Sequence, residues 1–155
     1  MHLIEDTRQK LGKHELKHNY WQKLGVNMIR SVLPFGDYAF ISPVVVDTKK
    51  DIYEMAYDLF QDHDRFRKEC IKARNAKCQL VVLIENTDGV DNLESLKRWV
   101  ESIEHYKKRR GKRRISGERM VRTMTTMTER YGVLWEFCTP NESGRRVIEL
   151  LEAGK

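Results

Sequence analysis

Two aspartates and a lysine of the kind that serve phosphodiester chemistry lie between Gly36 and Lys50. Asp37 follows a glycine, and a single residue separates Asp47 from Lys49. Hydrolysis of a phosphodiester requires neutralised charge on the phosphoryl oxygens and a nucleophilic water at neutral pH, and carboxylate-bound Mg²⁺ or Mn²⁺ supplies both. The segment therefore predicts the metal site of a nuclease, in which Lys49 orients or activates the water or stabilises the pentacovalent transition state.

The same segment is predicted to form two paired strands. Tyr38–Ile41 and Val44–Val46 are rich in β-forming residues and flank a Ser-Pro break. Strand alternation places Asp47 and the lysine two residues later on one face. A loop with an odd number of residues sets Asp37 opposite Asp47 on that face, whereas a two-residue loop sends the two acids to opposite faces.

A simpler interpretation of the two acids remains open. Acidic residues are common at strand ends, where Asp37 could be an ordinary turn residue. Asp47 could equally be the N-cap of a helix that begins near Ile52. The spacing of the residues does not decide between these roles and a metal site.

The length and composition of the chain predict one globular domain. Its 155 residues can bury a substantial core, and 40% hydrophobic residues are ordinary for a soluble protein. The first residues lack a secretory profile, and the longest apolar run, Leu80–Ile84, is too short to cross a bilayer. We therefore expect a cytoplasmic protein, nucleoid-associated if its source is a prokaryote or a phage, with no membrane partner.

The charge and the cysteines restrict the class of partner. A formal net charge of +6 favours a polyanion, with nucleic acid ahead of an acidic membrane surface. The three cysteines, Cys70, Cys78 and Cys138, are odd in number and have no metal-ligand spacing. They predict neither a disulfide framework nor a zinc site.

Strand-like and helical periodicities alternate along the chain. The expected strands are Leu3–Glu5, Val26–Leu33, Tyr38–Ile41, Val44–Val46, Gln79–Glu85 and Gly132–Cys138. The expected helices cover Lys13–Leu24, Ile52 to Leu59, Phe66 to Ala73, Leu93 to Ile103, Val121 to Met127 and Val147 to Leu151. A capping box over Thr139–Glu142, with Pro140 at the first helical position, is expected to begin the last helix. Strands interleaved with helices predict a three-layer α/β domain.

Further charged residues follow two of the expected strands. Asp6 and Arg8 come at the end of the first strand, where open α/β sheets place their chemistry. The strand Gln79–Glu85 holds a continuous apolar run and ends in an acid, which is typical of a central strand covered on both faces. If the strands align, Glu85 lies near the acids of the hairpin.

A basic segment follows the helix that ends near Ile103. It carries seven cations in eight positions, Lys107, Lys108, Arg109, Arg110, Lys112, Arg113 and Arg114. We expect these side chains to contact DNA phosphates, which gives salt-dependent affinity without reading the bases. The alternative is a solvated charged loop.

Two other patterns have simpler explanations than a ligand site. His14 and His18 have the i, i+4 spacing of helical metal ligands but lack a nearby third ligand, so a solvated helix surface is the preferred interpretation. Met120, Met124 and Met127 recur at helical spacing and are expected to fill the core.

Several of these motifs, in this order, resemble the XPF-type nuclease family of the PD-(D/E)xK superfamily. The family includes eukaryotic excision-repair and Mus-type nucleases and the archaeal Hef protein. The resemblance rests on Asp6-Thr7-Arg8, Leu33 to Tyr38, Val46 to Lys49, Leu83-Ile84-Glu85, Arg65-Phe66 and Cys138 to Ser143, and it covers nearly the whole chain. It does not extend to the helix-hairpin-helix module that often follows this domain, so we expect another segment to hold the substrate.

The resemblance implies a fold and roles for individual residues. It implies a restriction-endonuclease-like fold, with a central mixed sheet flanked by helices, for a single nuclease domain over residues 1–155 with a basic helical insertion at about residues 87–115. The implied catalytic residues are Asp6, Arg8, Asp37, Asp47 and Lys49, with the three aspartates binding Mg²⁺ or Mn²⁺ and with Arg65 and Glu85 at the edge of the site.

The chain departs from the family pattern at four positions. Gln9 and Asp47 replace glutamates, Thr48 replaces an arginine, and Tyr53 occupies the position of a further acid. Asp51 and Glu54 are candidates to compensate for that acid. The leading hypothesis is a metal-dependent endonuclease for branched, flap or single-strand/double-strand junction DNA, which pairs as a homodimer or a nuclease-domain heterodimer. The alternative is a catalytically weak or inactive DNA-binding or dimerising scaffold of the same fold.

Overall fold

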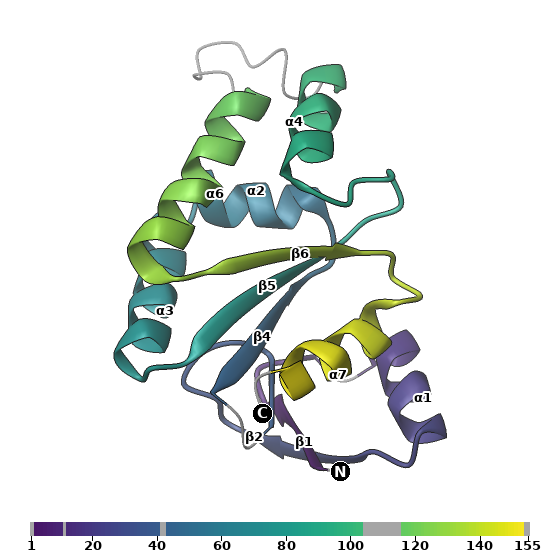
Figure 1. Cartoon of the computed structure of the whole chain (residues 1–155). Coiled ribbons are helices and arrows are strands. Elements are labelled where there is room, and N and C mark those ends of the chain that lie inside the picture. Colours follow the sequence, from purple (N-terminus) through teal and green to yellow (C-terminus); the bar gives the residue numbers. More distant parts are fainter. Residues whose placement is uncertain (1, 11, 41–42, 104–115, 154–155) are drawn as a thin grey trace.

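A single mixed β-sheet organises the chain. The structure, a computed structural model, describes residues 2–10, 12–40, 43–103 and 116–153. Six strands pair in the order β2-β1-β3-β4-β5-β6 (Figure 1). They are β1 (His2–Asp6), β2 (Asn27–Ser31), β3 (Tyr38–Ala39), β4 (Val44–Lys49), β5 (Gln79–Glu85) and β6 (Leu134–Cys138). The pairs that include β3 are antiparallel and the others are parallel, so the predicted mixed sheet is confirmed.

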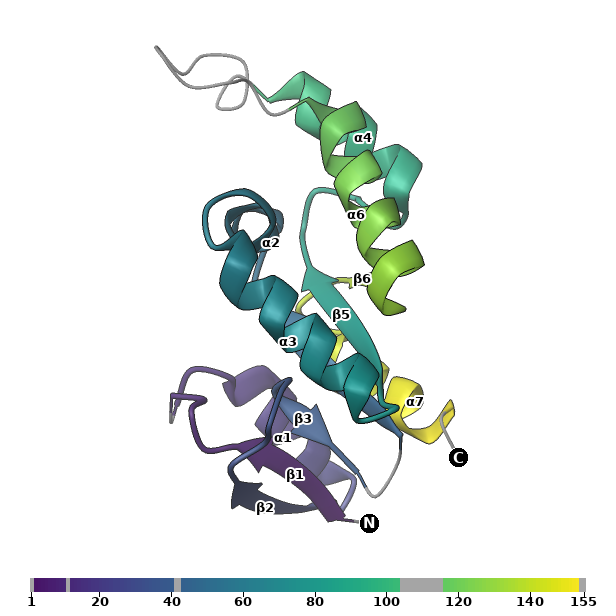
Figure 2. The same ribbon diagram turned by 90° about the vertical axis from the view of Figure 1, so that its left-hand side faces the viewer.

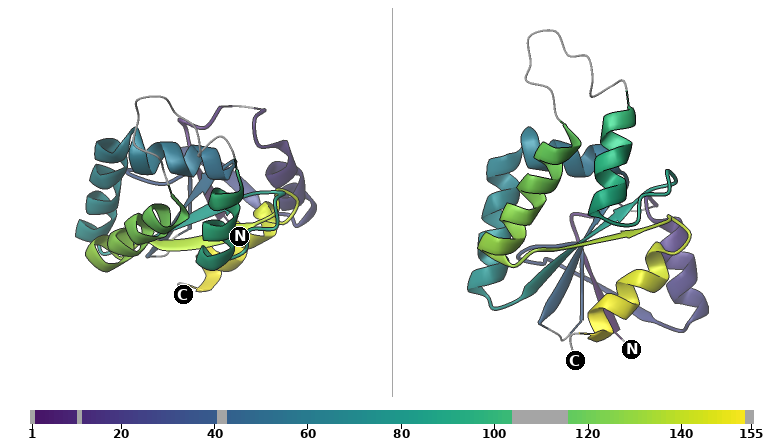
Figure 3. Two further views of the ribbon diagram at one scale, coloured as in Figure 1. Left: turned by 90° about the horizontal axis from the view of Figure 1, so that it is seen from above. Right: turned by 45° about the horizontal axis from the view of Figure 1, so that its top comes forward.

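Helices cover both faces of this sheet. On one face lie α1 (Glu15–Lys23) and α7 (Ser143–Ala153), which pack against each other (Figures 1 and 3). On the other face lie α2 (Ile52–Phe60), α3 (His63–Asn75) and α6 (Gly117–Tyr131), and α4 (Leu93–Ser102) packs against α6 (Figure 2). The three-layer α/β prediction is therefore confirmed. Among the described residues, no helix combines the length and apolar character needed to span a membrane.

The alternation of β4 assigns its side chains to the two hydrophobic layers. Val44 and Val46 pack in the cluster beneath α1 and α7, and Val45 packs in the cluster beneath α2 and α3. Asp47 and Lys49 continue the parity of Val45, so both face α2 and α3. The three methionines at helical spacing fill the same cluster, as predicted. They are Met120, Met124 and Met127.

The register of the central hairpin decides the position of Asp37. Tyr38 pairs with Val46 and Ala39 pairs with Val45. Continued by one residue, this register sets Asp37 opposite Asp47, and the Asp37 amide donates to the Val46 carbonyl at 2.9 Å. The arrangement expected for an odd-numbered loop is confirmed, whereas the arrangement expected for a two-residue loop is wrong.

Several predicted element boundaries were wrong by a few residues. The helix predicted from Lys13 begins at Glu15, and the strand predicted over Val26–Leu33 is limited to Asn27–Ser31. Pro140 precedes the last helix instead of starting it, because α7 begins at Ser143. Glu142 accepts from the Thr139 amide at 3.1 Å, but the Thr139 hydroxyl also donates to that carboxylate, so only half of the capping box forms.

The hairpin predicted to span Ile41 and the basic segment 107–114 both include residues outside those that the structure describes. The predicted insertion at about residues 87–115 is therefore described only in part, through α4 and the loop before it.

The hairpin has a position that strongly favours glycine. Gly36 has a φ of +71°, and a Cβ at this position would meet Val45 Cγ1 at 2.2 Å. Gly89 has a nearly equal φ of +74°, but a Cβ there would meet no atom within 4 Å. Gly89→Ala should therefore lower the free energy of unfolding by about 1–2 kcal/mol, because alanine disfavours the left-handed conformation.

Gly36→Ala should lower the free energy of unfolding by roughly 1–3 kcal/mol more than Gly89→Ala does, because the added methyl must also displace Val45. Urea unfolding of the two variants measures the difference. Equal losses of stability would contradict the close packing of Gly36 on β4.

Candidate active site

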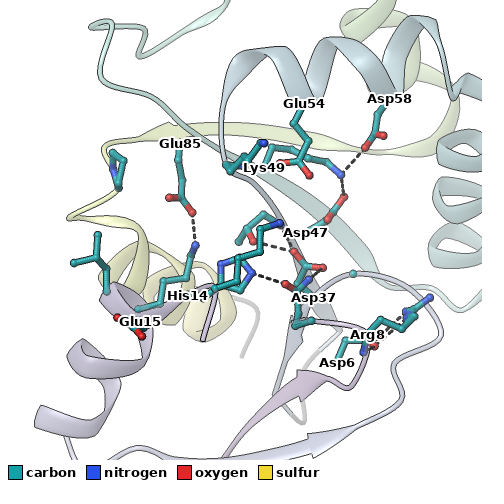
Figure 4. Close-up of a pocket in the computed structure, with 18 of the residues that line it drawn as sticks. Asp6, Arg8, His14, Glu15, Asp37, Asp47, Lys49, Glu54, Asp58 and Glu85 are labelled. Atoms are coloured by element: carbon teal, nitrogen blue, oxygen red, sulfur yellow. Dashed lines mark hydrogen bonds and ion pairs between the residues drawn. The ribbon is translucent and has the colours of Figure 1, made fainter. Parts of the chain in front are cut away.

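The predicted site residues line one pocket of about 570 Å³. The pocket lies where the chain leaves β1, β4 and β5, between the segment that leads into α1 and the helices α2 and α3 (Figure 4). Its walls include every predicted catalytic and edge residue, Asp6, Arg8, Asp37, Asp47, Lys49, Arg65 and Glu85. The pocket also contains acids and cations that the sequence did not identify.

The Lys49 ammonium is held between two carboxylates. Its Nζ lies 2.9 Å from Asp47 Oδ2 and 2.6 Å from Asp58 Oδ2, and only 6% of the residue is exposed. It also lies 5.7 Å from the centre of the Phe66 ring. Burial alone would lower the pKa of Lys49, but Asp47 and Asp58 outweigh this effect and raise it above its usual value. Lys49 is therefore a fixed cation at neutral pH.

A second layer of charges fixes the partners of Lys49. Arg65 donates to Asp58 at 2.6 Å and to Asp62 at 2.5 Å, and it lies 3.5 Å from Glu69. Glu69 in turn accepts from the amide of Gly36 at 2.8 Å. Arg65 thus lines the pocket, and it contacts Asp58, the partner of Lys49, together with two further acids.

Asp37 carries the most perturbed carboxylate of the pocket. Its Oδ2 accepts from the Thr48 amide and the Thr48 hydroxyl, both at 2.8 Å, and its Oδ1 accepts from Gln9 Nε2 at 2.5 Å. Burial, followed by repulsion from Asp47, raises the pKa of Asp37 to about 7 in spite of these donors. A divalent cation would relieve this repulsion.

Asp47 lines the same pocket and offers a second carboxylate to such a cation. Its Oδ2 is buried and, apart from the ion pair with Lys49, no donor in the described part of the chain makes a hydrogen bond with it. Mg²⁺ binds through one or two carboxylates and retains several waters, so it does not require a closed cage of protein ligands. Asp37 and Asp47 fit this requirement.

Asp6 does not complete a three-aspartate metal site. Arg8 forms an ion pair with Asp6, the Arg8 amide donates to Asp6 Oδ1 at 2.7 Å, and the Leu33 amide donates to Oδ2 at 3.1 Å. Burial would raise the pKa of Asp6, but these donors lower it. Within the residues that the structure describes, no three histidine, cysteine or acidic side chains converge on a possible metal position. The predicted metal site with three aspartate ligands is therefore not formed, because the Asp6 carboxylate already accepts hydrogen bonds from Arg8 and Leu33.

Glu85 lines the pocket from the other hydrophobic layer. It forms a buried ion pair with Lys17 of α1, and the Ser143 hydroxyl at the start of α7 donates to it at 2.9 Å. Figure 4 shows Glu85 across the pocket from Asp37 and Asp47. Glu85 thus shares the pocket with the hairpin acids, as expected. Its own contacts are with α1 and α7, which it links to β5.

The two histidines of the N-terminal region do not share a ligand. His14 Nε2 hydrogen-bonds Gln9 Oε1 at 2.5 Å, and His18 Nε2 lies 2.7 Å from Glu5 Oε1. Burial, followed by the neighbouring cations Lys17 and Lys13, lowers the pKa of His14 to about 4. The contact with His14 holds the side chain of Gln9, the donor to Asp37.

The simpler interpretation of Asp47 as a helix cap is wrong. Asp51 is the N-cap of α2, and its side chain accepts from the Glu54 amide at 2.7 Å. Glu54 accepts from the Lys50 amide at 2.8 Å, and Tyr53 packs against Trp99. Asp51 is thus committed to the start of α2, whereas Glu54 lines the pocket and can contribute negative charge there.

Sequence reasoning missed Asp58, Glu69 and Lys17. A signal for the first two was present, because Asp58 lies three residues after the core residue Met55 and Glu69 lies three residues after Phe66. These spacings put an acid on the buried side of each helix. Lys17 gave no such signal, because its buried partner Glu85 is far away in the sequence.

Comparisons with known proteins identify the fold. No family model and no curated protein sequence matches the chain. The solved structure of XPF from Aeropyrum pernix matches with a TM-score of 0.68 and 17% identity, over 99% of this chain and 64% of that one. A structure of XPF from Aeropyrum pernix in complex with DNA matches with a TM-score of 0.67 and 18% identity, over 98% of this chain and 64% of that one.

These matches establish the architecture. The chain has the fold found in XPF from Aeropyrum pernix, and it spans less than two thirds of the length of that protein. The resemblance seen in the sequence motifs is thereby confirmed at the level of the fold.

The electrostatics of Asp37 predict a pH dependence of stability. The pKa of Asp37 rises from 3.8 to about 7 on folding, so the folded state holds its proton more tightly than the unfolded state. Stability from this group is therefore present below about pH 4 and is lost as pH rises towards 7. Without divalent metal, Asp37→Asn should remove this decline, so the stability of the variant relative to the native chain should increase between pH 4 and 7.

Denaturant unfolding at a series of pH values in chelator measures both proteins. Parallel stability curves for the two proteins would contradict the raised pKa of Asp37.

Proposed function

We propose that this chain is a divalent-metal-dependent DNA endonuclease that hydrolyses phosphodiester bonds at branched, flap or junction DNA. The observation that carries the proposal is the pair Asp37 and Asp47 beside the buried cation Lys49 in an open pocket. The fold shared with XPF supports the class of reaction, and the preference for branched DNA follows from the resemblance of the motifs.

Asp37 and Asp47 would hold Mg²⁺ or Mn²⁺. The bound cation supplies a water of lowered pKa and neutralises charge on the phosphoryl group. The two carboxylates come from adjacent antiparallel strands, so the backbone hydrogen bonds of the hairpin fix their separation. Thr48 limits the rotation of Asp37 through two hydrogen bonds to one oxygen.

Lys49 acts as a positioned cation in this proposal. Asp47 and Asp58 form ion pairs with the ammonium of Lys49, which carries three N–H donors. In this proposal a donor that neither carboxylate engages serves the attacking water or a phosphoryl oxygen. Because Lys49 stays protonated, it orients the water and stabilises the transition-state charge, and it does not remove a proton as a base.

The proposed partner is DNA with a strand junction. One matching structure is a complex of XPF with DNA, and this chain carries a net charge of +6. The seven cations between Lys107 and Arg114 are proposed to contact the phosphates on either side of the junction. Pairing with a second nuclease domain, identical or related, is part of the same proposal.

A specific observation favours a second candidate function, a DNA-binding scaffold with weak or no cleavage. Gln9 and Thr48, two of the departures from the family pattern, donate to both oxygens of Asp37. A metal must displace the Gln9 amide or bind through the remaining lone pairs. If it does neither, the chain binds junction DNA with high sensitivity to salt and leaves it intact.

Cleavage of labelled flap and fork DNA by Asp47→Asn tests the proposed nuclease. The substitution keeps the shape of the side chain but removes one charge of the metal-binding pair, while Asp58 still accompanies Lys49. We expect cleavage in Mg²⁺ or Mn²⁺ to fall by at least about 10²-fold, comparable to the loss of one transition-state contact, with unchanged DNA binding.

Glu118→Gln is the matched control, because Glu118 is an exposed acid on α6 that pairs with Arg122. It should cut at the native rate. Undiminished cleavage by Asp47→Asn would refute the site, and intact DNA with the native chain in both metals would favour the scaffold.

A further inference from the structure

Helix α2 presents aromatic side chains next to the pocket. Glu54 and Asp58 line the pocket, whereas Tyr53 and Tyr57, one turn apart, lie on the adjoining solvent face. Tyr53 is 44% exposed and Tyr57 is 58% exposed. Because each tyrosine directly precedes a pocket-lining acid, the aromatic face and the pocket wall are neighbouring sides of the same helix.

Other elements extend this face into an aromatic strip. It is formed by the exposed Tyr53 and Tyr57 and by Phe60 and Trp99, which are half-buried against the hydrophobic core. Trp99 of α4 meets Tyr53 edge to face, with 5.5 Å between the ring centres. The guanidinium of Arg119, from α6, lies 4.9 Å from the centre of the Phe60 ring. Three helices thus contribute to a surface that combines flat rings with a cation.

Flat rings beside a cation suit unpaired nucleobases. Bases of a single strand stack on tyrosine and tryptophan, and arginine adds attraction to the phosphates and rings. In a duplex the base faces are covered by their neighbours, so the same strip offers little to paired DNA. The exposed cations Lys50 and Arg98, on the segments that carry Tyr53 and Trp99, suit the phosphates of the same strand.

We infer that the aromatic strip stacks the unpaired bases of a single-stranded DNA arm that leaves the pocket. The inference rests on the proposed nuclease function and adds a residue-level basis for the choice of junction DNA. The strip borders the wall that holds Asp58, the partner of Lys49, so a strand bound there places its junction at the metal-binding aspartates.

Binding to a fork with single-stranded arms, compared with a duplex of equal length, tests the inference. Both are measured by fluorescence anisotropy in chelator, in the Asp47→Asn background, so that binding is read without cleavage. Tyr57→Ala should weaken fork binding by about five- to tenfold, near the lower end for loss of one stacked base, and leave duplex binding unchanged.

Tyr57→Phe retains the ring and should bind the fork like the parent protein. Val32, the residue after β2, is 72% exposed. Val32→Ala therefore controls for the loss of exposed apolar surface and should leave fork binding unchanged. A 2-aminopurine in the single-stranded arm should be quenched by the parent and by Tyr57→Phe, and much less by Tyr57→Ala.

Equal fork affinity for Tyr57→Ala and Tyr57→Phe would overturn the stacking surface. A change from dimer to monomer in sedimentation of Tyr57→Ala would also overturn it, because the strip would then bind a second copy of the chain. Both outcomes are independent of cleavage by the native chain, so failure of the stacking inference is distinguishable from failure of the proposed nuclease.

Discussion

The buried ion pairs of Lys49 are the constraint on which the site depends. An ammonium so little exposed is tolerated only with close anionic partners, and Asp47 and Asp58 supply them from β4 and α2. This requirement fixes α2 over the end of β4 and, through Arg65, fixes α3 beside it. The ion pairs of the pocket therefore add to the hydrophobic contacts that pack these two helices on the sheet.

Asp37 shows how the hairpin brings two ordinary acids together at the proposed cation site. Antiparallel pairing sets Asp37 opposite Asp47 across the strands, at a depth where water screens their repulsion poorly. The surrounding donors do not cancel this repulsion, since Gln9 and Thr48 are neutral. Gln9 and Thr48, two of the departures from the XPF-type pattern, thus leave negative charge in the pocket that a divalent cation can compensate.

Local patterns predicted much of this arrangement, because they reflect local physics. The alternation of β4 placed Asp47 and Lys49 on one face, and the apolar run of β5 predicted a central strand. The partners of these residues depend on tertiary packing: Asp58 approaches Lys49 only because α2 crosses the strand end, and Lys17 meets Glu85 through α1. The hydrogen bonds that Arg8 and Leu33 donate to Asp6 likewise depend on how the chain folds back beside β1.

The central claim is that Asp37 and Asp47 together bind a divalent cation. Titration of Mn²⁺ at about pH 8, followed by electron paramagnetic resonance and calorimetry, measures this binding without any DNA. The account predicts saturable binding by the native chain and by Glu118→Gln, and strongly weakened binding by Asp47→Asn and by Asp37→Asn. Native-like Mn²⁺ affinity in either aspartate variant, or no binding by the native chain, would contradict it.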